Sequence, residues 1–196
     1  MDRQQHNHLK LMLIEKWVKC GQRVLDVGCG FGGDFHKWQK VGATYIGVDP
    51  SEESLTEARR RFKSASLLHG TLFDVPRGLR FNVLCFNFSL QYCRPVLRET
   101  MERAHELLTE YGIVIGVVPD SEKICLGLDP CYTVTPTLDH VTVFIPGTPY
   151  YETKGPMTEP LIGQQDIIQS CEGLFHMIEW SDFNKVYSKF ILRKKP

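Results

Sequence analysis

The sequence lacks a surplus of either charge, because lysine plus arginine and aspartate plus glutamate number 23 each among 196 residues. This balance excludes a chain that grips long nucleic acid through a general basic field, so any nucleic acid must be held locally. The sequence also has no apolar run of membrane-spanning length, and its first residues do not read as a secretory signal. We therefore expect no membrane partner.

Paired cysteines and clustered metal ligands are lacking as well. The seven cysteines are an odd number without a Cys-x-x-Cys pair, and the seven histidines show no metal spacing. We expect reduced thiols in a reducing, cytosol-like compartment and no metal. Repeats, low-complexity segments and linkers are also missing, so we expect one compact domain over residues 1–196.

The most informative segment is rich in glycine and begins after a short apolar run at residues 23–27. It reads Gly28-x-Gly30-x-x-Gly33 and leads into a helix start, and a second apolar run at residues 45–48 ends in Asp49. A strand, a glycine loop, a helix and a strand tipped with an acid form a nucleoside-binding βαβ unit. The glycines let the backbone approach the ligand, and the acid accepts hydrogen bonds from ribose hydroxyls.

Two ligand classes fit this unit, a dinucleotide and S-adenosylmethionine. The glycine spacing alone is a weak signal, but Asp26 stands at the tip of the first strand, just before the glycines. An acid there would repel a pyrophosphate and would hold the ammonium of a methionine moiety. Asp26 and Asp49 together favour S-adenosylmethionine as the cofactor.

The rest of the chain continues the alternation of helices and strands. Two adjacent strands are expected near the C-terminus, and Pro and Gly become frequent from about residue 119 to 160. We expect mainly loop and hairpin there, with one strand at 141–145, and this insertion is expected to bind substrate. Helices are expected at 8–19, 33–41, after Ser51, at 95–108 and at 164–171, and strands at 66–69, 82–86, 113–118, 175–180 and 185–192.

This alternation predicts an α/β fold with a seven-stranded, mostly parallel, doubly wound sheet that ends in an antiparallel hairpin. Ligands bind such sheets outside the carboxyl ends of the strands. Four polar side chains are expected at these ends: Asp26, Asp49, Asp74 and Asn87.

Several segments together resemble the mRNA cap guanine-N7 methyltransferases of eukaryotes and large DNA viruses. Asp26-Val-Gly-Cys-Gly-Phe-Gly-Gly-Asp34, closed by Lys37-Trp38, is similar to the extended glycine motif of that family. Residues 7–14 resemble its Asn-Asn-aromatic-Ile-Lys segment, and residues 87–92 its Gln-Phe-x-x-His-Tyr motif. The resemblance implies a class I S-adenosylmethionine-dependent methyltransferase fold, which is Rossmann-like.

The resemblance implies roles for the cofactor-binding residues. Lys10 would face the cofactor carboxylate, and Asp26 with the backbone of Gly28 and Gly30 would hold the methionine end. Asp49 would bind the ribose, Asp74 the adenine amine, and Asn87 would complete the cofactor site.

It also implies a set of substrate-binding residues. The guanine pocket would be lined by Gln91, Tyr92, Glu159 and Tyr187, whereas Arg61 would lie near the cap phosphates and Asn7 on the substrate side. Two positions depart from the family pattern. Gln91 stands where the motif has histidine, and Phe31 stands where a basic residue is common.

The expected reaction is methyl transfer from S-adenosylmethionine to guanine N7 of a GpppN RNA cap. Because that nitrogen carries no proton, we expect proximity catalysis without a catalytic base. The expected partner is a capped 5′ RNA end, and other capping-enzyme domains or subunits are possible partners, in a cytoplasmic or nuclear setting of cellular or viral origin. Two alternatives remain open: a methyltransferase with another small-molecule or RNA substrate, and a silent stimulatory subunit of a capping enzyme.

Overall fold

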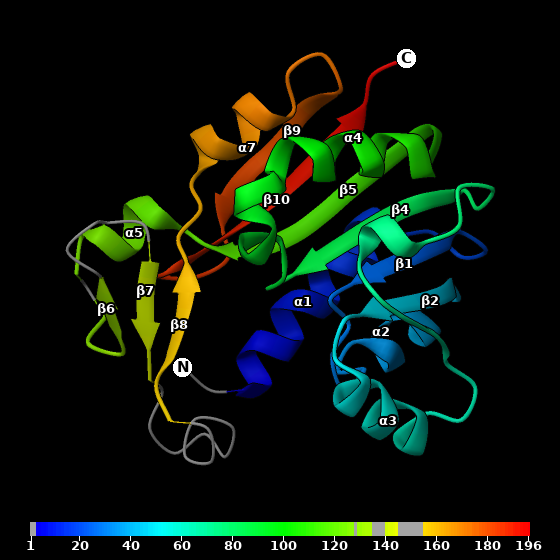
Figure 1. The fold of residues 1–196 in the computed structure, drawn as a ribbon, viewed down its shortest axis with the longest axis horizontal. Helices are drawn as coiled ribbons and strands as arrows, with labels where there is room; N and C mark the ends of the chain where they lie inside the picture. The colour runs from blue at the N-terminus through cyan, green and yellow to red at the C-terminus, as the bar shows by residue number, and fades with distance from the viewer. Residues whose placement is uncertain (1–2, 128, 135–139, 145–154) are drawn as a thin grey trace.

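The computed structural model describes residues 3–127, 129–134, 140–144 and 155–196. Figure 1 shows a large twisted sheet with helices on both faces and a smaller sheet at one end. The elements, in chain order, are α1 (Arg3–Trp17), β1 (Arg23–Val27), α2 (Phe35–Lys40), β2 (Thr44–Asp49), α3 (Glu52–Arg61), β3 (Ser66–His69), the 3-10 helix η1 (Leu72–Asp74), β4 (Phe81–Asn87), the 3-10 helix η2 (Leu90–Val96), α4 (Leu97–Leu107), β5 (Leu108–Pro119), α5 (Ser121–Cys125), β6 (Tyr132–Val134), β7 (His140–Val143), β8 (Met157–Pro160), α7 (Gln164–Ser170), β9 (Phe175–Asp182) and β10 (Tyr187–Lys194).

The large sheet has seven strands in the order β3-β2-β1-β4-β5-β10-β9. Strands β1 to β5 pair in parallel, whereas β10 runs antiparallel to both β5 and β9. The predicted seven-stranded sheet with its terminal antiparallel hairpin is confirmed. The strand order reverses between β1 and β4, and the carboxyl ends of these strands are where ligands bind in doubly wound sheets.

Two hydrophobic cores fill the space between the sheet and the helices on either face. Val24 packs with Ile14 of α1 and Trp38 of α2, whereas its neighbour Leu25 packs with Met101 of α4. Successive side chains of a strand point to opposite faces, so one short apolar run supplies both cores. This double burial holds the ends of β1 and β4 in fixed positions beside the helices (Figure 1).

The start of α3 follows the prediction made from Ser51. The Ser51 hydroxyl accepts a hydrogen bond from the Ser54 backbone amide at 3.2 Å, and acidic residues fill the first turn of the helix. Basic residues fill its last turn, which is the charge order that the helix dipole favours. As a result, Asp49 at the end of β2 is joined to α3 by a short, well-capped turn.

The segment after β5 has more regular structure than predicted. Loop and hairpin with one strand were expected, whereas its described residues form α5 and the antiparallel strands β6, β7 and β8. The strands are only three or four residues long, too short to show a clear alternation in the sequence. Figure 1 shows this small sheet beyond the carboxyl ends of the parallel strands.

Two boundaries also differ from the prediction. Pro95 lies inside η2, and α4 begins only at Leu97. Strand β5 begins at Leu108, five residues before the expected start at residue 113, and its register with β4 shifts between Phe81 and Val83. The seven cysteines are free thiols. Among the described residues, no helix has the length and apolar character needed to cross a membrane.

Candidate functional site

A cavity of about 560 Å³ lies at the carboxyl ends of β1, β2 and β4. Backbone and side chains from the glycine loop, from the end of β2, from η1 and from the segment after β4 line it. Its lining residues are Val27, Gly28, Val48, Asp49, Pro50, Gly70, Thr71, Leu72, Phe73, Phe88, Ser89, Tyr92, Cys93 and Val96. Both its position and its volume suit a nucleoside-sized ligand.

The glycine loop borders the cavity in a conformation that needs glycine. Gly28 has φ +74°, and a Cβ atom there would lie 2.5 Å from the Cβ of Ser89. The Ser89 hydroxyl donates to the Val27 carbonyl at 2.5 Å, which fixes this close approach. A side chain at Gly28 would therefore separate the loop from the segment after β4.

Asp49 ties the end of β2 to the glycine loop. Its Oδ2 accepts a hydrogen bond from the Gly30 amide at 2.7 Å, and its Oδ1 accepts one from the Ser51 amide at 2.9 Å. The carboxylate lines the cavity and is mostly buried. The structure thus brings together three of the predicted cofactor residues, Gly28, Gly30 and Asp49.

Asp26 lies behind the loop, at the end of β1, with only 3% of its surface exposed. Its Oδ2 accepts a hydrogen bond from Trp38 Nε1 at 3.3 Å. Burial, followed by the nearby negative charge of Asp34, raises the pKa of Asp26 from 3.8 to about 7. A cation placed beside Asp26 would remove this cost of ionisation.

A network around Asp34 joins α1, α2 and β4. The Nζ atoms of Lys10 and Lys37 each lie 2.7 Å from Asp34 Oδ1, and Asn87 Nδ2 donates to Oδ2 at 2.9 Å. Lys37 Nζ also donates to Asn7 Oδ1 at 3.1 Å. Burial opposes the ionisation of Asp34, but the two ammonium groups outweigh burial and lower its pKa.

Sequence reasoning missed Asp34 as a member of the site. It placed Lys10 opposite the cofactor and gave Asp34 no role, although the acid closes the glycine motif. The structure shows that Lys10 and Asn87 contact this one carboxylate directly, and that Asn7 is joined to it through Lys37. The available signal was the unusual acid directly after two glycines, close to Lys37 in the sequence.

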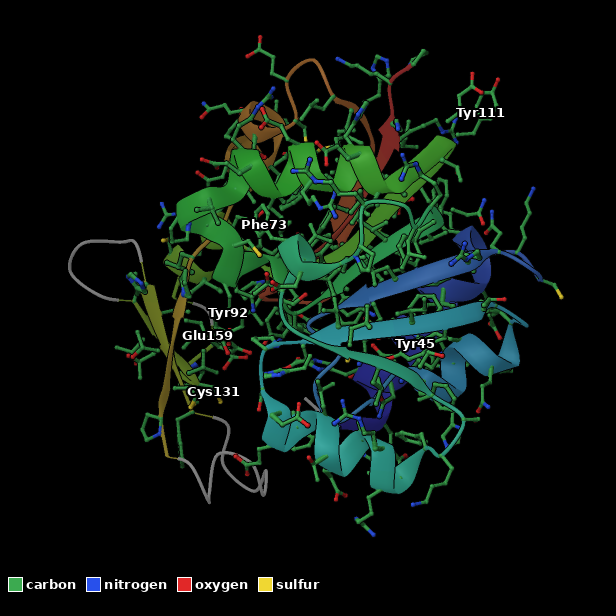
Figure 2. All side chains as sticks on the ribbon, turned by 45° about the vertical axis from the view of Figure 1, so that its right-hand side comes forward. Tyr45, Phe73, Tyr92, Tyr111, Cys131 and Glu159 are labelled. Atoms are coloured by element: carbon green, nitrogen blue, oxygen red, sulfur yellow. The ribbon has the colours of Figure 1, made fainter. Side chains whose placement is uncertain are left out.

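A second polar cluster contains Gln91 and Tyr92 of η2 and Glu159 of β8. Gln91 is almost fully buried, and its Nε2 donates to the Phe88 carbonyl at 3.1 Å and to Glu159 Oε2 at 3.3 Å. The Tyr92 hydroxyl also hydrogen-bonds the Glu159 carboxylate. Figure 2 shows Tyr92 and Glu159 side by side, with Tyr92 on η2 and Glu159 on β8 of the small sheet.

The environment of this cluster favours a ligand with hydrogen-bond donors. Burial raises the pKa of Glu159 above its ordinary value, and the hydrogen bonds with Gln91 and Tyr92, which lower the pKa, offset this only in part. The two acceptors around Gln91 Nε2 fix the orientation of the amide, and its buried Oε1 has no hydrogen-bond partner among the described residues. Tyr92, with 52% of its surface exposed, lines the cavity beside them.

Phe88 connects the cavity to an aromatic cluster that sequence reasoning missed. Among the described residues, Phe88 is the one non-glycine residue with a positive φ, at +60°. Backbone strain of this kind occurs at ligand sites. The Phe88 ring stacks on His6 of α1 at 5.9 Å and meets Tyr187 edge-to-face at 4.9 Å. His6 also contacts Phe183, so the N-terminal helix and the C-terminal hairpin together support the segment that carries Gln91.

Three predicted residues lie outside the two polar clusters. The Asp74 carboxylate is exposed and accepts hydrogen bonds from the backbone and hydroxyl of Thr71, whereas its neighbour Phe73 lines the cavity. Tyr187 is 7% exposed, and its hydroxyl bonds the Tyr132 hydroxyl. Arg61 is exposed and donates to the Phe31 carbonyl at 3.0 Å.

The fold matches solved structures of S-adenosylmethionine-dependent methyltransferases. One from Clostridium acetobutylicum superposes with a TM-score of 0.73 at 15% identity, covering 100% of this chain and 93% of that one. Another is the 1,6-didemethyltoxoflavin-N1-methyltransferase of Burkholderia thailandensis, solved with bound 1,6-didemethyltoxoflavin and S-adenosylhomocysteine. It has a TM-score of 0.70 at 14% identity and covers 100% of this chain and 80% of that one. The expected class I methyltransferase fold is confirmed.

Residues 2–131 match the family model of the mRNA (guanine-N(7))-methyltransferase domain, and the chain belongs to this family. It is 34% identical over 140 residues to the mRNA cap guanine-N(7) methyltransferase of Saccharomyces cerevisiae, covering 61% of this chain. The match covers 32% of that relative, so the chain spans about a third of its length. The expected family is therefore confirmed, and the matches agree with S-adenosylmethionine as the cofactor.

Proposed function

We propose that this domain transfers the methyl group of S-adenosylmethionine to guanine N7 of a GpppN RNA cap. The single observation that carries this proposal is the cluster of Gln91, Tyr92 and Glu159. The cluster holds a partly buried carboxylate beside Tyr92, whose aromatic side chain lines a cavity bounded by the glycine loop. The family to which the chain belongs supplies the reaction class.

The polar residues at the loop fit the methionine end of the cofactor. Asp26 is a buried acid whose ionisation a ligand ammonium would favour, and Asn87 Oδ1 is a buried acceptor without a partner in the part of the chain that the structure describes. Lys10, held by Asp34, would face the cofactor carboxylate, and Asp49 at the cavity wall would bind the ribose. When bound, the cofactor supplies an activated methyl group on a sulfonium.

The adenine end would occupy the apolar part of the cavity. Leu72 and Phe73 line this part, and Thr71 with Gly70 borders it. Asp74, proposed to bind the adenine amine, would do so from the turn that its carboxylate stabilises through Thr71. The apolar walls would exclude water from the reacting atoms.

On the substrate side, the cluster offers acceptors and a stacking face. Glu159 and Gln91 Oε1 would accept hydrogen bonds from guanine N–H groups, and the Tyr92 ring would stack on the base. Tyr187 and Asn7 would act indirectly. Tyr187 would support Phe88 by packing against its ring, and Asn7 would hold Lys37 through a hydrogen bond. Arg61 would meet the cap phosphates from the far side of the loop.

Catalysis would follow from placement and electrostatics. Guanine N7 attacks with a lone pair and has no proton to lose, so the residues need only align it with the methyl group. The purine gains positive charge during transfer. The carboxylate of Glu159, close to the base, would stabilise that charge more strongly in the transition state than in the ground state.

The domain organisation and setting belong to the same proposal. Residues 1–196 would form one methyltransferase domain in which the 119–160 insertion binds substrate through Glu159. The relatives are longer than the matched segment, which supports action together with further capping-enzyme domains or subunits on a capped 5′ RNA end. The expected setting is nuclear or cytoplasmic and reducing, in a cellular or viral capping system.

Labelled S-adenosylmethionine tests the proposal directly. The protein would be incubated with GpppG-capped RNA, with uncapped RNA and with free GTP, and the products digested to nucleosides. We expect label in 7-methylguanosine from the capped RNA and no label in the uncapped RNA. Label in another nucleoside would indicate a methyltransferase with a different substrate. Of the two alternatives, the neutral Gln91 in place of histidine favours this one over the silent subunit. Cofactor binding without any transfer would indicate a silent subunit.

A further inference from the structure

Phe31 presents its ring to solvent from the middle of the glycine loop. With 41% of its surface exposed, it stands between Gly30 and Gly32, which have φ +50° and +72°. The loop around it is fixed, because Gly30 N donates to Asp49 and Gly32 N donates to the Cys29 carbonyl at 2.9 Å. The ring therefore projects from a defined backbone.

A cation accompanies this ring. The Arg61 guanidinium donates to the Phe31 carbonyl at 3.0 Å and lies 4.8 Å from the centre of the Phe62 ring. Its neighbours Arg59 and Arg60 instead form ion pairs, with Glu52 and Glu57. Glu57, whose pKa Arg61 also influences, is bound by Arg60, so the Arg61 charge remains accessible to an anion beside Phe31.

A third observation places this pair next to the cavity. Gly28 lines the cavity and stands three residues before Phe31. Three residues of chain span at most about 11 Å, a distance that a nucleotide phosphate bridge can cross. An aromatic face with a neighbouring cation, at this distance from a base pocket, is the combination that binds a nucleotide through stacking and charge.

We propose that Phe31 stacks the base of the first transcribed nucleotide of the capped RNA while Arg61 meets the phosphates that join it to the cap. This inference rests on the proposed function. It also explains the departure from the family pattern at Phe31. A basic residue is common at this position in the family, whereas in this chain Phe31 provides an aromatic face for stacking. Because every base has a π-face, the contact would accept any first nucleotide.

The test compares two ligands that differ by one nucleoside. Calorimetry on the protein loaded with S-adenosylhomocysteine gives the Kd of GTP, which lacks the second nucleoside, and of GpppG, which has it. Parent, Phe31→Ala, Phe31→Leu, Phe31→Trp and Arg61→Ala are compared. Tyr111→Ala is the matched control, because Tyr111 is 82% exposed and Figure 2 shows it far from Tyr92 and Glu159.

The parent should bind GpppG more tightly than GTP. Phe31→Ala should weaken GpppG binding about tenfold and change GTP binding less than twofold, and Phe31→Trp should stay within threefold for both. Phe31→Leu keeps apolar bulk in the loop and should still lose at least threefold for GpppG alone. Arg61→Ala should weaken both ligands, and Tyr111→Ala neither. The Kd of S-adenosylhomocysteine should change less than twofold throughout.

Two results would overturn the inference and leave the proposed function standing. One is equal affinity of the parent for GpppG and GTP, and the other is an equal change, or none, for both ligands in Phe31→Ala and Phe31→Leu. A parent that binds neither ligand would overturn the proposed function itself, and this inference with it.

Discussion

Replacing Asp26 by asparagine should stabilise the fold at neutral pH while it damages the cofactor site. Asp26 is buried, and its pKa in the folded protein is about 7, compared with 3.8 for the free side chain. Folding therefore requires either proton uptake or a buried negative charge beside Asp34. An asparagine Oδ1 can still accept the hydrogen bond from Trp38 Nε1, so the substitution removes the charge and keeps the contact.

The size of the effect follows from the two pKa values. A carboxyl whose folded pKa is raised makes the protein less stable as pH rises from the unfolded pKa to the folded one, and the loss then levels off. The folded and unfolded pKa values of Asp26 differ by about three, and at 1.36 kcal/mol for each pKa unit the free energy of unfolding is lowered by ~4 kcal/mol once the pH is well above 7. Between pH 5 and pH 8, the advantage of Asp26→Asn over the parent should grow by about 3 kcal/mol.

Urea unfolding at pH 5, 6, 7 and 8 would measure this difference, and calorimetry would measure cofactor affinity. Asp74→Asn is the control of opposite sign, because hydrogen bonds from the Thr71 backbone and hydroxyl lower the pKa of Asp74. That variant should show no stability gain at pH 8. If Asp26→Asn shows the same stability difference from the parent at every pH, or is less stable at pH 8, the assignment of a strained buried charge is wrong. S-adenosylmethionine affinity should fall at least tenfold in Asp26→Asn, ~1.4 kcal/mol.

Three further predictions concern the substrate and the reaction. Glu159→Gln should lower cap methylation more than about tenfold and leave S-adenosylmethionine affinity within about twofold, since a charge-assisted hydrogen bond is worth ~1.5–3 kcal/mol; a variant as active as the parent would remove Glu159 from the site. Gln91→Ala should lose cap methylation in a product assay, whereas Gln91→His should keep at least about a tenth, ~1.4 kcal/mol; equal activity of the parent and Gln91→Ala would contradict contact with the base. With saturating S-adenosylmethionine, the single-turnover rate should vary less than about threefold between roughly pH 6.5 and 8.5, because no proton leaves N7. A log-linear rise of the rate with pH would instead indicate a nucleophile that must lose a proton. The affinity for S-adenosylmethionine should rise with pH as Asp26 ionises near pH 7.

The sequence predicted the half of the site that depends on local order along the chain. Asp26 and Asp49 each follow an apolar run directly, so their place at a strand end could be inferred from neighbouring residues. The same holds for Ser51, whose hydroxyl caps α3 as expected. These features need no knowledge of which distant elements pack together.

The other half depends on contacts between segments far apart in the chain. The partners of Asp34 come from α1, α2 and β4, and the contact between Glu159 and Gln91 joins residues 68 positions apart. The burial of Tyr187 depends on Tyr132, Phe88 and His6, which pack against it from three other segments. The apolar residues of β10 indicate that the strand is buried on both faces, but they do not show which segments cover Tyr187.

The contact between Gln91 and Glu159 has a consequence for how such a domain can diversify. Gln91 belongs to η2, which follows β4 of the large sheet, and Glu159 belongs to β8 of the small sheet, whereas the glycine loop and Asp49 follow or end strands of the large sheet alone. A substitution in η2 or a change of length in the small sheet can therefore alter the base pocket without changing the strand ends that carry the glycine loop and Asp49. The preference for the methyl-accepting substrate can therefore change while the residues that hold the methyl donor stay the same.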